Sequence, residues 1–153
     1  HLVFTTVHAN NVFDVIGRFM HMKIDPHNLV SALNGVLAQR LVRVNCTRCA
    51  TDEMPPPELL QESGLSDVTG YRFRAGKGCG HCRGTGYQGR RVVAELLTLD
   101  DEMRELIVSR APLRLLKEHA MSRGFRSLRQ SGLALVASGE TTLQELNRVS
   151  FSE

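Results

Sequence analysis

The chain has 153 residues, a formal net charge of +3 and a pI near 8.9, and its length fits one domain or a domain with an attached piece. Hydrophobic residues make up 42% and charged residues 23%, as in ordinary packed globular proteins, and no apolar run is long enough to cross a membrane. The weak positive charge and the lack of Trp give no support to nucleic-acid binding, and we expect no nucleic-acid partner.

Up to the first cysteine, the sequence pattern predicts two helices between two strands. We expect a strand over 1–7, helices over 12–22 and 25–37, and a strand over 39–44. Asn10 or Asn11 is the expected N-cap of the first helix. Asp25 is the expected cap of the second helix, with Pro26 at the first helical position.

After the first cysteine, the sequence predicts short strands around an insert between the cysteine motifs, and then a series of helices. We expect a helix from Pro55 to Gly64, strands over 71–74 and 91–99, and helices after Asp100, after Pro112 and over 127–138. Thr141, with Gln144 three residues later, predicts a capping box for a last short helix.

Two Cys-x-x-Cys motifs contain all four cysteines of the chain, and 29 residues separate them. Each motif places two sulfurs on one turn, and four thiolates can surround one Zn²⁺ ion tetrahedrally. Because no cysteine is left over, the spacing predicts a structural zinc site. Its ligands are Cys46, Cys49, Cys79 and Cys82.

Other interpretations of the cysteines are a redox pair and four ordinary buried thiols. A thioredoxin-like motif needs one Cys-x-x-Cys at the start of a helix, which two distant pairs fit poorly. Residues 79–86 also resemble the Cys-x-x-Cys-x-Gly-x-Gly repeat of DnaJ-type chaperone zinc domains, although no such glycines follow Cys49. A stand-alone zinc-dependent, chaperone-like protein-binding module is therefore the alternative function.

Several segments together resemble the type II secretion and type IV pilus assembly ATPases. The opening HLVFTTVHAN, residues 1–10, is similar to the histidine box of that family, and residues 31–43 resemble the segment before its cysteines. Residues 84–90 follow the second motif as in the family, and residues 124–129 and 139–145 are similar to its C-terminal helices. The resemblance covers essentially the whole chain.

This resemblance implies a mixed α/β fold made of three parts. Residues 1–45 would form the C-terminal part of a RecA-like ATPase core, 46–90 a four-cysteine zinc-binding insert, and 91–153 a helical C-terminal subdomain. The family binds ATP and Mg²⁺ through a Gly-x-x-x-x-Gly-Lys-Ser/Thr loop, and this sequence does not contain one. We therefore expect a C-terminal fragment that begins at the histidine box and does not hydrolyse ATP without the rest of its parent enzyme.

Two residues outside the cysteine motifs are implied as site residues. His8 would be catalytic, because an imidazole can donate to γ-phosphate oxygens or help to position the attacking water; a capping or packing histidine is the alternative. Arg90 would be cofactor-binding, because its guanidinium could reach a phosphate or an acidic side chain on a neighbouring subunit; a solvated surface arginine is the alternative.

The resemblance also implies the setting in which the parent works. We expect a homo-hexamer in the cytoplasm, peripheral to the bacterial inner membrane, that couples ATP hydrolysis to protein secretion or to pilin and pseudopilin assembly. Its partners would be platform proteins of the secretion or pilus machinery. The basic excess is compatible with an anionic phospholipid surface.

Overall fold

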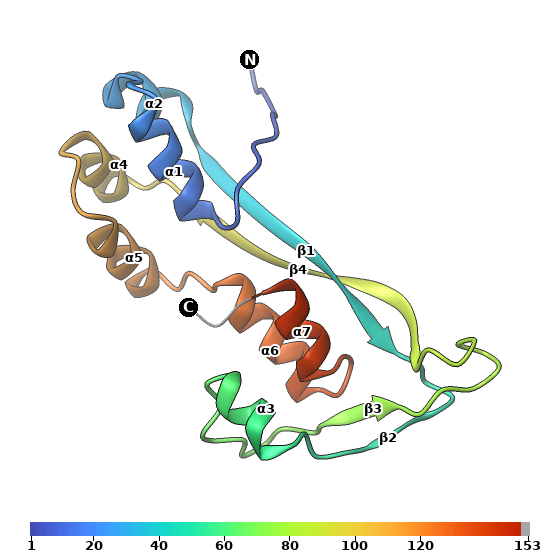
Figure 1. Ribbon diagram of the computed structural model, residues 1–153. Coiled ribbons are helices and arrows are strands. Elements are labelled where there is room, and N and C mark those ends of the chain that lie inside the picture. Colours follow the sequence, from blue (N-terminus) through green and yellow to red (C-terminus); the bar gives the residue numbers. More distant parts are fainter. Residues whose placement is uncertain (151–153) are drawn as a thin grey trace. The chain divides into compact units, whose positions relative to one another are not determined.

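The computed structural model describes residues 1–150 and is a mixed α/β structure with two small two-stranded sheets (Figure 1). Strand β1 pairs with β4 in one sheet, and β2 pairs with β3 in the other. The chain forms two compact units, each assembled from two stretches of sequence: residues 1–38 with 95–127, and residues 39–94 with 128–150. The division into three consecutive parts stays a prediction.

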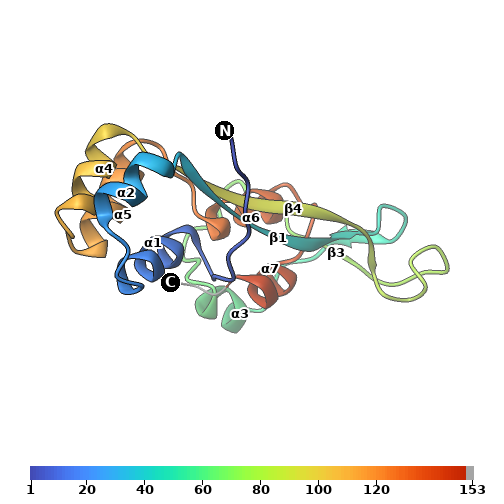
Figure 2. The ribbon, with the colours of Figure 1, turned by 90° about the horizontal axis from the view of Figure 1, so that it is seen from above.

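Four helices and the ends of two strands make up the first unit (Figure 2). The helices are α1 (Val12–His21), α2 (Pro26–Ala32), α4 (Asp101–Val108) and α5 (Leu113–Ser122). Their apolar faces share one core, which includes Ile16, Met103, Ile107 and Leu116, all fully buried.

The caps of these helices largely follow the sequence prediction. Asn11 caps α1 by accepting from the backbone amide of Asp14, and Asp25 caps α2 with Pro26 at the start. Asp100 caps α4 by accepting from the amide of Met103. Helix α2 is shorter than expected, because Leu33 is already extended and the following residues join β1.

The expected opening strand is wrong. Residues 1–9 are irregular and mostly exposed, and the side chain of Phe4 remains 88% accessible. A strand needs a neighbouring strand to accept and donate its backbone hydrogen bonds. Within the described residues, no strand pairs with this segment.

Most of the strand residues and three helices belong to the second unit. The strands are β1 (Gly35–Asn45), β2 (Ala50–Asp52), β3 (Arg74–Gly76) and β4 (Tyr87–Thr98), and β1 and β4 also supply residues to the first unit. The helices are α3 (Pro57–Glu62), α6 (Leu128–Ala137) and α7 (Leu143–Val149). None of the helices within residues 1–150 has the length and apolarity needed to cross a membrane.

A separate apolar core holds the helices of the second unit together. Phe73, Val136, Leu143 and Leu146 are buried in it, and residues of α3 pack against them. Helices α6 and α7 approach closely at Gly132, where an added Cβ would lie 2.2 Å from a methyl carbon of Leu146. Helix α7 therefore has a fixed place on α6, and the polar contacts described below depend on it.

Candidate metal centre

The four cysteine sulfurs converge in the second unit, and every pair of them lies within 4.8 Å. The Sγ atoms of Cys46 and Cys79 are 3.9 Å apart, those of Cys49 and Cys82 are 3.8 Å apart, and those of Cys79 and Cys82 are also 3.8 Å apart. A tetrahedral Zn²⁺ with Zn–S bonds of about 2.3 Å requires S–S distances of about 3.8 Å. The sulfurs thus have the spacing of a four-thiolate zinc site.

The same distances argue against a disulfide. A disulfide needs an S–S separation of about 2.05 Å, and all four cysteines are free. The sulfurs are also shielded, since Cys46 and Cys82 are buried and Cys49 and Cys79 are partly buried. Four thiols gathered at metal-binding spacing fit Zn²⁺ better than they fit a redox pair.

Each Cys-x-x-Cys motif is a tight turn closed by its own backbone hydrogen bonds. In the first, the carbonyl of Cys46 accepts from the amides of Cys49 and Ala50. In the second, the carbonyl of Cys79 accepts from the amide of Gly84. Both turns therefore hold their two sulfurs on the same side without help from distant residues.

The β2–β3 pairing and a close glycine contact bring the two turns together. Strand β2 follows the first turn, β3 precedes the second, and Ala50 is paired with Gly76 in an antiparallel register. Beside this pair, a Cβ added to Gly76 would lie 2.0 Å from the carbonyl oxygen of Gly86. Only a residue without a side chain fits at this point, so the glycines near the cysteines allow the two turns to approach.

Backbone amides around the sulfurs favour thiolate formation. Burial tends to raise the pKa of Cys82, but the amides of Cys79 and Gly86 donate to its sulfur at 3.1 and 3.3 Å and lower the pKa to about 6. Burial raises the pKa of Cys49 to about 12, and hydrogen bonds with the sulfurs of Cys46, Cys79 and Cys82 also oppose its ionisation. A divalent cation would remove this opposition, since Zn²⁺ binds thiolates and releases their protons.

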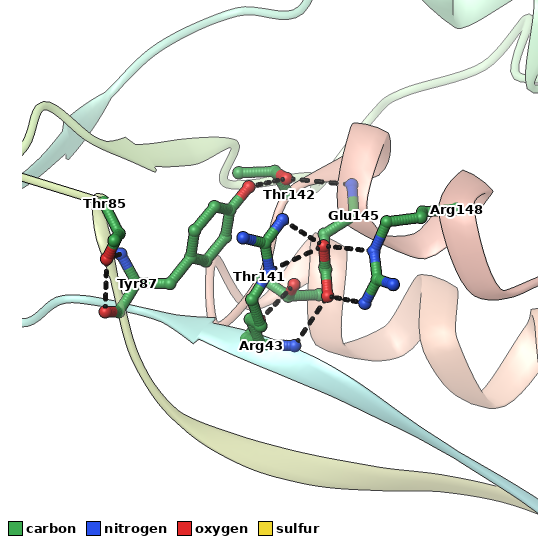
Figure 3. Close-up of polar contacts among 7 residues, drawn as sticks. All are labelled: Arg43, Thr85, Tyr87, Thr141, Thr142, Glu145 and Arg148. Carbon is green, nitrogen blue, oxygen red and sulfur yellow. Dashed lines mark hydrogen bonds and ion pairs between the residues drawn. The ribbon is translucent and has the colours of Figure 1, made fainter.

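A chain of hydrogen bonds leads from the second cysteine turn to helix α7 (Figure 3). The hydroxyl of Thr85 donates to the carbonyl of Cys82 at 2.7 Å and accepts from the amide of Tyr87 at 3.2 Å. The phenol oxygen of Tyr87 lies 2.7 Å from the hydroxyl of Thr142, which caps α7 by accepting from the amide of Glu145. The second cysteine turn and the start of α7 are thereby linked by hydrogen bonds.

A buried carboxylate lies at the end of this chain. Glu145 has no exposed side-chain surface and binds the guanidinium groups of Arg43 and Arg148 at 2.7 and 2.8 Å (Figure 3). Burial alone would raise the pKa of Glu145, but the hydrogen bonds from the two arginines lower it to about 2. The guanidinium carbon of Arg43 also lies 4.3 Å from the centre of the Tyr87 ring, so the arginine joins the carboxylate to the tyrosine.

Sequence patterns missed most of this network. The expected capping box began at Thr141, but Thr142 is the cap and Glu145 occupies the third helical position. Thr141 instead donates to the backbone carbonyl of Arg43 at 2.7 Å. The Thr-x-x-Glu spacing of 142–145 was the available signal; nothing local pointed to Arg43.

The two other predicted site residues lie in different units. His8 is exposed in the irregular segment that precedes α1, in the first unit. Arg90 is exposed on β4 in the second unit, and its side chain makes no ion pair within residues 1–150. Their roles therefore stay predictions.

A family model described as type II/IV secretion system protein matches residues 1–148 of the chain. The chain belongs to this family. The type IV pilus assembly ATPase PilB of Thermus thermophilus is 43% identical over 148 residues, which are 95% of this chain and 17% of that protein. The type II secretion system protein HxcR of Pseudomonas aeruginosa is 39% identical, over 97% of this chain and 28% of HxcR.

Both branches of the type II/IV secretion family are thus similar to the chain at comparable levels. The type II secretion system protein E of Pseudomonas aeruginosa is 37% identical over the whole chain and 30% of its own length. The chain therefore spans less than a third of the relatives described here. The resemblance seen in the sequence motifs is confirmed at the level of the family.

Proposed function

We propose that this chain is the C-terminal portion of a traffic ATPase that couples ATP hydrolysis to protein secretion or to pilin and pseudopilin assembly. The supporting observation is the family match over residues 1–148, together with relatives named as pilus assembly ATPases. In this proposal, residues 1–45 complete a RecA-like core. The parent binds ATP and Mg²⁺, works as a homo-hexamer in the cytoplasm and docks on platform proteins at the inner membrane, where anionic phospholipid supports its binding.

Within the proposed enzyme, the zinc centre is structural. The four thiolates would fill every position of a tetrahedral ion, which leaves no open site for substrate or water. Zn²⁺ would supply folding free energy by joining the turn after β1 to the turn before β4. Chemistry at the nucleotide would belong to other residues of the parent.

The proposed catalytic residue is His8. Its imidazole would donate a hydrogen bond to a γ-phosphate oxygen or orient the attacking water, and it is exposed and available to a ligand. Arg90 would contact a phosphate or acidic group of the adjacent subunit, because an exposed guanidinium without an ion-pair partner in the described chain can reach outward.

The test is ATP hydrolysis by the full-length protein and by residues 1–153 alone, measured as phosphate release with Mg²⁺. We expect turnover from the full-length protein, a large loss in its His8→Ala variant, and none from the isolated segment. Turnover by the segment equal to that of the full-length protein would contradict the proposal. The coding sequence upstream of His1 gives an independent check: a Gly-x-x-x-x-Gly-Lys-Ser/Thr motif there supports an ATPase, whereas a start codon adjacent to His1 favours a stand-alone zinc module.

A further inference from the structure

Glu95 is a buried carboxylate in an otherwise apolar row of β4. Its neighbours on the same face of the strand, Val93 and Leu97, are buried hydrophobic residues, and Glu95 itself is only 4% exposed. A carboxylate in such surroundings is costly unless hydrogen-bond donors compensate it. Its presence in this row therefore calls for a specific partner.

One such partner is the first residue of α1. The carboxylate oxygen Oε1 of Glu95 accepts from the backbone amide of Val12 at 2.7 Å, across 83 residues of sequence. Amides in the first turn of a helix have no acceptor within the helix, and the positive end of the helix dipole favours a negative charge there. The cap Asn11 serves the amide of Asp14, so Glu95 satisfies an amide that the cap leaves open.

This contact holds the place at which the histidine segment enters the fold. Three residues separate His8 from Val12, and the segment up to residue 9 is irregular. Val12 is fully buried, and both Val12 and Glu95 belong to the first unit. A buried carboxylate thus anchors the end of the segment nearest to α1 on β4.

We propose that Glu95 is a positioning residue for His8. It acts through the amide of Val12 and does not touch the nucleotide itself, and this inference rests on the proposed role of His8 in ATP hydrolysis. Reactions at a positioned catalytic group are sensitive to displacement, and a shift of about 1 Å can reduce a rate by about 100-fold. Loss of the anchor should therefore lower kcat more than it weakens ATP binding.

Substitutions at Glu95 separate positioning from plain stability. Glu95→Leu removes the acceptor but continues the apolar row, so the variant should fold; a buried charge replaced by a hydrophobic residue is often neutral or stabilising. Glu95→Gln keeps a side-chain oxygen that accepts from the amide of Val12. Glu95→Asp keeps the charge but shortens the reach, and it serves if the leucine variant does not fold. Glu105→Leu makes the same chemical change at an exposed position of α4 and is the matched control.

The experiment measures kcat and KM for ATP in the full-length protein, the thermal unfolding of each variant, and backbone hydrogen exchange of the peptide that covers residues 8–16. We expect Glu95→Leu to lower kcat by about tenfold or more with KM within about twofold, and to speed exchange in this peptide. Glu95→Gln should restore most of kcat, Glu105→Leu should match the wild type, and Glu95→Leu should add little further loss to His8→Ala.

Three results would overturn the inference. The first is wild-type kcat in a folded Glu95→Leu variant when the separate His8→Ala variant is inactive. In that case the proposed function survives, but the positioning role of Glu95 does not. The second is unchanged exchange of residues 8–16 in Glu95→Leu, which would mean that the carboxylate does not hold the start of α1. The third is wild-type activity in His8→Ala, which removes the proposed role of His8 and the positioning role of Glu95 together.

Discussion

Arg43 binds Glu145 through both its backbone and its side chain. Its amide donates to Oε1 of Glu145 at 3.0 Å, and its guanidinium donates to Oε2 at 3.0 and 2.7 Å. These contacts join β1 to α7 across 102 residues of sequence. They secure α7 beside the strand that leads into the first cysteine turn.

Glu145→Gln should destabilise the second unit markedly. The substitution removes the charge that two guanidinium groups share, and breaking a buried pair on one side typically costs about 3–5 kcal/mol. The side chains of Arg43 and Arg148 are about half exposed and can be hydrated again in the variant. We therefore expect the free energy of unfolding, measured by urea unfolding, to fall by about 2–3 kcal/mol. Glu140→Gln is the control: its partner Arg91 is a surface residue, and exposed pairs contribute about 0–1 kcal/mol. Equal losses in the two variants would show that the Glu145 network adds nothing beyond a surface pair.

The low pKa of Glu145 predicts a specific loss of stability in acid. The carboxylate titrates at about 2 in the folded protein and at about 4.3 in an unfolded chain, so the unfolded state binds its proton first. The contribution is therefore fully present above about pH 5 and disappears as the pH falls toward 2. Unfolding free energies of wild type and Glu145→Gln, measured from pH 7 to pH 2.5, should converge as the pH falls. A constant difference across this range is the contrary result. Comparing the two proteins at each pH is necessary because Asp100 also has a lowered pKa, owing first to the amide of Met103.

Tyr87→Phe should loosen the link between the cysteine turn and α7 without removing the aromatic ring. The variant loses the 2.7 Å hydrogen bond to Thr142 but keeps a ring beside the guanidinium of Arg43. We expect a loss of about 1 kcal/mol in unfolding free energy, the usual net value of one hydrogen bond. Thr142→Val removes the same bond and also the N-cap of α7, so its loss should be larger by about 1 kcal/mol. A double-mutant cycle checks the coupling: strictly additive losses would mean that the two hydroxyl groups do not interact.

Local signals in the sequence were sufficient for three helix caps and for the grouping of the four cysteines. Asn11, Asp25 and Asp100 are caps because a short polar side chain precedes an apolar helical pattern, and this chemistry operates within three residues. The four cysteines were recognisable because their spacing alone places two sulfurs on each turn. Such features need no knowledge of the tertiary fold.

Contacts between distant segments left no comparable signal. The pairing of Arg43 with Glu145 depends on where α7 packs, and no local sequence pattern links these two residues. The role of Glu95 as an acceptor is equally absent from the local sequence pattern, because it depends on the approach of α1 to β4. The prediction of a strand over residues 1–7 was wrong for a related reason. The pattern of these residues suits a strand, but within the described residues no strand pairs with them.

Gly76→Ala should disrupt the metal centre by steric exclusion. The added methyl group would lie 2.0 Å from the carbonyl oxygen of Gly86; its position is fixed by the Cα of residue 76, and the oxygen belongs to the backbone, so neither can rotate away. The two cysteine turns would be forced apart, so we expect weaker Zn²⁺ retention and slower recovery of bound metal after chelation. Gly80→Ala is the control, because nothing lies within 4 Å of its added Cβ although the residue sits between two ligands. Competition with a chromogenic chelator gives the relative affinities, and equal affinities in the two variants would remove the steric argument.

Removal of the metal should loosen the second unit selectively. Elemental analysis of the purified protein is expected to give about one Zn per chain, since four thiolates complete one tetrahedral site. Chelation or Cys79→Ser should then speed backbone hydrogen exchange around residues 46–50 and 77–86, because structural zinc contributes folding free energy there. Through Thr85 and Tyr87, faster exchange should extend to the first turn of α7, and Tyr87→Phe should reduce this effect on α7.

The core around α4 and α5 contains no cysteine and should keep its protection against hydrogen exchange. Metal-free protein with cysteines paired as disulfides would contradict the zinc site, and uniform exchange throughout the chain would contradict its local role.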